Sequence, residues 1–226
     1  MHRLFNRWRA GAVCWIASAL LLPVQVLVAQ RWPGGYSITE NAISDLGVTY
    51  CGPFVDGNAL VRDVCSPWHL VFNAGVIASG ILMVIGAFFL HGWWTGRSGR
   101  AGTILMALAG ACVIVVGFTP WNLSPDLHDG AAFSQALAQW FAMLLLARAA
   151  GPGHFRLLAV VTVVISISGF VSFLAALQGM PVPLLGFGIA ERISFDSLTL
   201  WTAVAGIVVL ASEGRSAEEP PTGSAT

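Results

Sequence analysis

The sequence predicts an all-α protein, a polytopic membrane helix bundle with six transmembrane helices, both termini cytoplasmic, and one long outer loop that contains a short helix. Three observations predict this class: the composition, six long apolar runs, and the distribution of Arg. Of the 226 residues, 56% are hydrophobic and only 10% are charged, whereas soluble domains carry about 25% charged residues. The mean hydropathy is +0.76. These values exclude a disordered chain, a small disulfide-rich secreted domain and a nucleic-acid binder.

Six runs are long enough to cross the membrane, since a helix needs about 20 apolar residues to span the hydrocarbon. They cover residues 11–29, 68–90, 101–119, 130–146, 157–177 and 193–211. Gly, Pro or Arg residues separate them, as expected for turns. Residues 1–212 therefore form one six-helix transmembrane domain. Residues 213–226 are rich in Ser, Glu, Pro and Gly, and we expect a disordered cytoplasmic tail there.

The first run has two interpretations. It follows Arg3, Arg7 and Arg9, as a cleaved signal peptide would. Its apolar stretch is longer than the ~7–15 residues of a signal core, which favours a retained span.

The orientation follows from the loops, because Arg and Lys accumulate on the cytoplasmic side of membrane proteins. With the N-terminus inside, the inner loops hold seven Arg residues and no acid before the tail, and the outer loops hold three. The inner residues are Arg3, Arg7, Arg9, Arg97, Arg100, Arg148 and Arg156. The sequence thus predicts a multi-pass cell-membrane protein whose acids gather at the outer ends of its helices.

Two of the four cysteines, Cys51 and Cys65, lie in the same outer loop. An oxidising compartment favours a disulfide between them over two free thiols. Closing a loop of about 15 residues would contribute about 3 kcal/mol. Neither their spacing nor the nearby residues resemble a closed zinc site, so no metal is predicted. Cys14 and Cys112 fall within apolar runs, where they read as small buried hydrophobes.

The same outer loop, residues 30–67, contains a candidate short helix. Ser37 or Thr39 could cap its start and Gly47 could end it.

Four motifs along the chain resemble a known family. They are Asn41-Ala42-Ile43-Ser44-Asp45-Leu46-Gly47, Phe72-Asn73, Pro125 with His128, and Gly188-Ile189-Ala190-Glu191-Arg192-Ile193. In this order they resemble domain-of-unknown-function family 998 of prokaryotic membrane proteins. The resemblance implies a six-span bundle and no particular activity. The stretch between Leu46 and Pro67, with its cysteine pair, departs from the family pattern.

Polar residues recur on single faces of two predicted helices. His69 and Asn73 are four residues apart, and His128, Gln135 and Gln139 form a stripe on one face. Such a stripe points into a bundle rather than at lipid. The glutamines could serve as interhelical hydrogen bonds, whereas His128 at the outer end suits ligand binding or proton transfer.

The start of the sixth run carries Glu191 and Arg192. Arg192 could pair with Asp196 along the helix, anchor the interface, or hold an anionic group. The candidates for an opposing acidic side are Glu40, Asp45, Asp126 and Asp129. Asp45 could instead bond the amides of its own turn.

No zinc-protease, nucleophile-elbow, Walker or Cys-x-x-Cys motif occurs, and no cofactor is predicted. A hydrolytic triad with Ser44 and a metal site at His69 and His128 are weak alternatives.

Two functions remain. The first is a non-catalytic protein that binds a membrane lipid, a small anionic ligand or a membrane partner. The second is a membrane-embedded enzyme that acts on a lipid or isoprenoid by His and carboxylate proton transfer. The candidate pocket residues are Glu40, Asn41, Ser44, Asp45, His69, Asn73, Asp126, His128, Asp129, Gln135, Glu191 and Arg192. Among them, Asp45, His128 and Arg192 are predicted to line one outward-facing pocket.

Overall fold

The computed structural model describes residues 2–54, 58, 61–180 and 185–218. Seven α-helices, one 3₁₀ turn and a two-stranded antiparallel sheet make up this part of the chain. In chain order the elements are α1 (His2–Ser18), α2 (Leu21–Ala29), η1 (Ser44–Gly47), β1 (Cys51–Phe54), β2 (Arg62–Cys65), α3 (His69–Leu90), α4 (Gly96–Phe118), α5 (Pro125–Ala150), α6 (His154–Leu177) and α7 (Gly186–Glu218).

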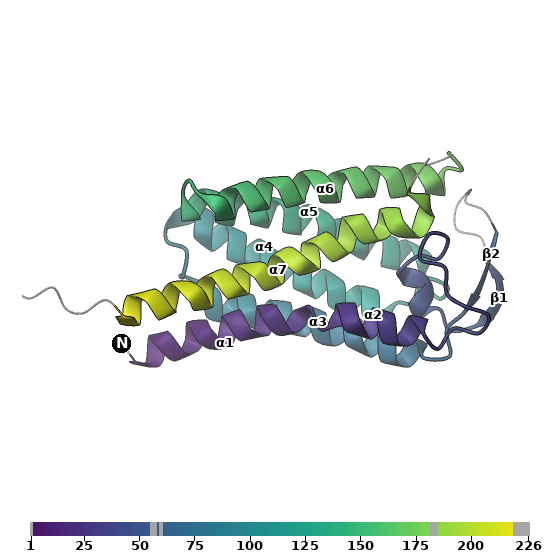
Figure 1. Cartoon of the computed structure of the whole chain (residues 1–226), viewed down its shortest axis with the longest axis horizontal. Helices are drawn as coiled ribbons and strands as arrows, with labels where there is room; N and C mark the ends of the chain where they lie inside the picture. Colours follow the sequence, from purple (N-terminus) through teal and green to yellow (C-terminus); the bar gives the residue numbers. More distant parts are fainter. Residues whose placement is uncertain (1, 55–57, 59–60, 181–184, 219–226) are drawn as a thin grey trace, which may run out of the picture.

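Six helical segments of the described chain are long and apolar enough to cross a membrane, with α1 and α2 counted together. The chain is a polytopic membrane helix bundle, as predicted. The helices form a closed ring, because each packs on its neighbour in sequence and α7 packs on α1. α1 begins and α7 ends at one end of the bundle, here called the termini end (Figure 1). The sheet and η1 lie at the opposite end, here called the loop end (Figure 1).

The first span is broken in the middle, between α1 and α2. Pro23 has no N–H and cannot donate to the carbonyl of Ala19. That carbonyl accepts instead from Leu22 at 3.0 Å, so the carbonyl of Ser18 loses its helical partner. The hydroxyl of Ser79 on α3 donates to it at 3.0 Å. Of the two halves of this span, α1 packs on α7 more closely than α2 does.

The observed spans agree with the predicted runs in number and order, and all but α3 are longer. α4 begins at Gly96 and α5 at Pro125, five residues before the predicted starts, because their first turns are polar and apolarity alone does not detect them. α7 continues to Glu218, so the helix includes the first six residues of the predicted tail. Residues 219–226 lie outside the described residues.

The outer loop folds against the bundle. Its short helix is the single 3₁₀ turn η1, which ends at Gly47 as predicted. Neither predicted cap opens that turn: the Ser37 hydroxyl accepts from the Glu40 amide at 3.3 Å instead, in a separate turn. The sheet pairs Cys51 with Cys65 across its two strands.

Candidate functional site

Arg192, in the first turns of α7, ties the outer loop to the bundle. One of its terminal nitrogens donates to the carbonyls of Asn41 at 3.1 Å and Gly188 at 3.0 Å. The other donates to the hydroxyl of Tyr36. That hydroxyl in turn donates to the carbonyl of Ala42 at 2.7 Å. The hydrogen-bond partners of this guanidinium among the described residues are neutral, so these contacts position Arg192 without neutralising its charge.

Burial of the Tyr36 side chain raises the pKa of its phenol, because a phenolate would lose its hydration. The nearby Arg192 opposes this shift but does not outweigh it. Tyr36 is therefore protonated at neutral pH and remains a hydrogen-bond donor.

Glu191 and Gly188 complete the attachment of the loop to α7. A carboxylate oxygen of Glu191 accepts from the amide of Ile43. The amide of Gly188 donates to the carbonyl of Thr39 at 2.9 Å. A Cβ at Gly188 would overlap the carbonyl oxygen of Asn41, so only Gly permits this close approach.

Asp45 makes a buried ion pair with Arg62 of β2. The guanidinium donates to both carboxylate oxygens, at 2.7 and 2.6 Å, and the two side chains are 1% and 8% exposed. The amide of Ala42 also donates to Asp45, at 2.9 Å. The guanidinium carbon of Arg62 lies 4.6 Å from the ring centroid of Phe187, so the ring covers one face of the charged group. Asp45 thus bonds its local turn, as one interpretation held, and also joins η1 to the sheet.

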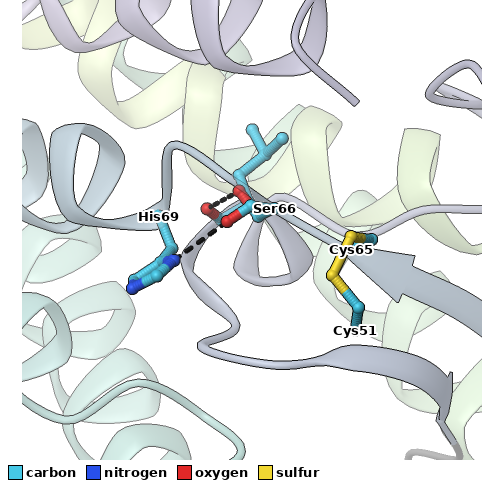
Figure 2. Close-up of a disulfide and its surroundings, with 5 residues drawn as sticks. Cys51, Cys65, Ser66 and His69 are labelled. Atoms are coloured by element: carbon cyan, nitrogen blue, oxygen red, sulfur yellow. Dashed lines mark hydrogen bonds between the residues drawn. A yellow bond between two sulfur atoms is a disulfide. The ribbon is translucent and has the colours of Figure 1, made fainter. Parts of the chain in front are cut away.

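The start of α3 holds the other side of η1. Asn73 donates to the carbonyl of Gly47 at 3.0 Å, and the hydroxyl of Ser66 donates to the carbonyl of Leu46 at 2.6 Å. His69 bonds the Ser66 carbonyl at 2.9 Å through Nδ1 (Figure 2). Because a carbonyl only accepts, that nitrogen carries the proton. These side chains satisfy loop backbone rather than face a ligand.

The predicted disulfide is present between Cys51 and Cys65, with their Cα atoms 4.2 Å apart (Figure 2). It joins β1 to β2 next to Ser66, so it restrains the sheet that carries Arg62. Cys14 and Cys112 are free and partly buried.

A small cavity of about 90 Å³ lies inside the ring of helices. A water molecule takes about 30 Å³ of the liquid, so this space suits a few waters or one small group. Its polar lining residues are Gln25, Ser44, Ser79, His128, Gln135, Glu191, Asp196 and Thr199. Phe72, Val76, Met83, Val113 and Phe195 are among its apolar ones. His128 is 9% exposed and its Nδ1 donates to the Thr119 carbonyl at 2.8 Å, which leaves Nε2 as an acceptor in the neutral ring.

A larger groove of about 570 Å³ opens on the surface of the bundle beside α2 and α7. Its lining comprises Leu22, Gln25, Val26, Ala29, Gln30, Trp32, Gly35, Tyr36, Ile38, Arg192 and Asp196. Val26 is 58% exposed and belongs to a span, so the groove faces hydrocarbon when the helices lie in a bilayer. It is apolar along α2 and charged on α7.

Gln25 and Asp196 line both the groove and the interior cavity. The amide of Gln25 donates to Asp196 at 2.8 Å. This pair is therefore the wall between the two spaces.

The predicted grouping of Asp45, His128 and Arg192 in one pocket is wrong. His128 lines the interior cavity and Arg192 lines the groove, whereas Asp45 lines neither and is bound by Arg62. The cause is that Tyr36 and Arg62, which were not among the candidates, bind the two charges separately. Of the other candidates, Ser44, Gln135 and Glu191 share the interior cavity with His128.

Three acidic candidates lie elsewhere. Glu40, Asp126 and Asp129 are exposed, and none lines the groove or the interior cavity. Of the alternatives for Arg192, an ion pair with Asp196 is not found among the described contacts, where each bonds a neutral partner. Asn41, buried at 6% exposure, bonds Asp45 and the Ser37 amide within the loop.

The polar stripe of α5 faces inward, as predicted. His128 and Gln135 line the cavity, and one turn further Gln139 donates to Thr202 and to the Leu198 carbonyl of α7 at 2.9 and 3.0 Å. Gln139 is thus an interhelical hydrogen bond of the kind expected for membrane glutamines. Sequence reasoning missed Gln25, although a polar residue inside an apolar run was the signal that could have identified it.

No group of three or more His, Cys, Asp or Glu within the described ranges is placed to hold a metal ion. The lining of the interior cavity includes carboxylate, imidazole and amide groups.

The model of one protein family, described as "Protein of unknown function (DUF998)", matches residues 16–208. This match confirms the resemblance found in the four motifs. No curated protein and no solved structure matches the chain.

Proposed function

The chain belongs to this family of unknown function, and we propose from its own site that it binds a membrane lipid. The lipid lies in the groove beside α2 and α7 and is not chemically changed there. The carrying observation is the groove itself, an opening of about 570 Å³ between two spanning segments with apolar residues along one wall and charges on the other. Its volume lies within the ~300–1,000 Å³ of small-molecule sites.

The packing of the first span supports this proposal. α1 packs on α7, whereas α2 packs mainly on α3, and the groove lies beside α2 where its contact with α7 is weak. In a bilayer such a groove fills with acyl chain, since water is absent at that depth.

A pair of variants tests the proposal. Val26→Trp would fill the groove, whereas Leu27→Trp adds the same side chain at the next position of α2, where Leu27 is 41% exposed but does not line the groove. The purified proteins are compared by native mass spectrometry after mild detergent extraction. We expect the first variant to lose most of the retained lipid and the second to retain it. Equal retention in both would refute the groove as the site.

The interior cavity favours a second candidate function, a membrane-embedded enzyme. It brings His128 to the same cavity as Glu191 and Asp196, and such groups suit general acid and base chemistry on a lipid or isoprenoid. Proteoliposomes made with a native lipid extract discriminate the two functions. Binding alone leaves the lipid composition unchanged, whereas conversion by the wild type but not by His128→Gln would establish catalysis.

The proposal includes the position in the cell. We infer a cell-membrane location with both termini cytoplasmic, because Arg97, Arg100, Arg148 and Arg156 all lie in the terminal turns of helices at the termini end. The groove then opens to the outer leaflet. An alkaline phosphatase fused to the C-terminus should be inactive, and activity there would reverse the orientation.

A further inference from the structure

The two charged residues of the groove face the same space but do not bind each other. Arg192 and Asp196 are one turn apart on α7, about 6 Å along the helix axis, at a spacing that commonly permits an ion pair. Arg192 donates to two carbonyls and a phenol, and Asp196 accepts from Gln25 at 2.8 Å. Neutral partners therefore hold a positive and a negative charge apart at the edge of an apolar groove.

From this arrangement we infer that the groove selects a zwitterionic phospholipid whose headgroup ends in a primary ammonium. The inference rests on the proposed lipid binding and adds the headgroup class. A headgroup of this class carries a phosphate and an ammonium on a short spacer, which matches Arg192 beside Asp196. The acyl chains lie along Leu22 and Val26 of α2.

Each charge retains the capacity to bind its half of the headgroup. A guanidinium has five N–H donors, and within the described contacts Arg192 uses three, which leaves Nε and one terminal hydrogen for phosphate oxygens. Asp196 uses Oδ1 for Gln25, so Oδ2 is available to an ammonium. The Gln25 carbonyl oxygen is a second acceptor in the same lining.

The same contacts disfavour two other headgroups. A choline headgroup has no N–H to donate to Asp196 and depends on open aromatic faces. The face of Tyr36 is already covered by Arg192, whose guanidinium lies 5.2 Å from the ring centroid. An anionic phosphatidylglycerol has no ammonium to donate to Asp196, whose carboxylate repels its negative charge.

Native mass spectrometry of the delipidated full chain tests the inference, with phosphatidylethanolamine, phosphatidylcholine and phosphatidylglycerol of identical acyl chains as probes. We expect the wild type to prefer phosphatidylethanolamine by about tenfold, a difference of about 1.4 kcal/mol. Asp196→Asn keeps the shape and the acceptor for Gln25 but removes the charge, so it should abolish that preference and increase phosphatidylglycerol binding. Asp126→Asn removes an exposed acid outside the groove and should behave as the wild type.

The outcomes separate the two claims. If no lipid binds to any protein, the proposed function fails. If lipids bind but the wild type and Asp196→Asn show the same preference, the headgroup assignment is wrong and the groove holds bulk lipid only. If soluble glycerophosphoethanolamine competes as well as the whole lipid, the occupant is a solute and the lipid assignment is overturned.

Discussion

At the loop end of the bundle, side chains bond to the backbone of distant segments, whereas at the termini end aromatic rings pack on one another. Trp94 stacks on Trp15 at 5.9 Å and on Phe155 at 6.2 Å between ring centroids. Trp201 continues the series at 5.5 Å from Phe155. These contacts join α1, α6, α7 and the connection between α3 and α4 through apolar surface.

The difference follows from the backbone at each end. Helices satisfy their own N–H and C=O groups, but the described residues of the loop between α2 and α3 have only a 3₁₀ turn and a short sheet with which to do so. Asn73, Glu191 and Arg192 supply the missing partners. Most polar residues of the loop end therefore hydrogen-bond to backbone and stabilise the fold. Arg192 and Asp196 differ, because their hydrogen-bond partners are neutral and their charges are not paired by those contacts.

The largest effect expected at the loop end comes from Asp45→Asn. It removes the carboxylate charge that the buried Arg62 binds through both oxygens, and removing one partner of a buried pair costs about 3–5 kcal/mol. Thermal unfolding in detergent, followed by hydrogen exchange, should show an early opening of η1 and the sheet with the aromatic end still folded. Asp63→Asn, at an exposed acid next to Arg62, is the matched control and should change little. An unchanged unfolding temperature in Asp45→Asn would show that the ion pair does not stabilise the loop end.

The disulfide should have the next largest effect. Replacing both Cys51 and Cys65 by Ser removes a restraint worth about 3 kcal/mol for a loop of this size. Reductant should lower the unfolding temperature of the wild type and leave that of the double variant unchanged. Maleimide labelling of native membranes without reductant should miss both cysteines. Labelling of both would contradict the bond.

Two glycines compare the ends directly. Gly188→Ala pushes a methyl group against backbone of the outer loop, and Gly86→Ala pushes one against the indole of Trp15. Each overlap should cost about 1–3 kcal/mol. Hydrogen exchange at the Ile43 amide should increase only in the first variant, because only that clash displaces the loop. Gly130→Ala adds a methyl group in open space and should be neutral. Equal exchange in all three would show that the Gly188 methyl does not displace the loop, and an equal increase in Gly188→Ala and Gly86→Ala alone would mean that the two ends are coupled.

The sequence predicted the termini end better than the loop end, for a physical reason. Long apolar runs report helices directly, so six spans were found and their order was correct. The inward stripe with Gln135 and Gln139 was equally readable, because helical spacing fixes which residues share a face.

Which residues bind the charges of the loop end depends on how segments far apart in the sequence come together in space. The spacing of residues along one helix does not give this information. Arg62 lies 17 residues from Asp45, and Tyr36 lies 156 residues from Arg192. Both were needed to see that Asp45 and Arg192 occupy separate places. The disulfide was predictable because the loop contains only two cysteines. The broken first span was not predicted, although Pro23 could have indicated it.

The smallest effect concerns the protonation of Tyr36. The chain has two tyrosines, so Tyr50→Phe leaves Tyr36 as the single phenol, and its ionisation can be followed by ultraviolet absorbance. Burial raises the pKa of Tyr36, so in the folded protein the phenolate should form above the ordinary value of about 10. A folded-state pKa above the unfolded one means that the contribution to stability is fully present below about pH 10 and is lost as the pH rises further. Loss of the proton also removes the hydrogen bond to the Ala42 carbonyl, so alkaline solution should open the loop while the aromatic stacks persist. Ionisation of the folded protein at the ordinary value would contradict a buried phenol and with it the contact that positions Arg192 in the groove.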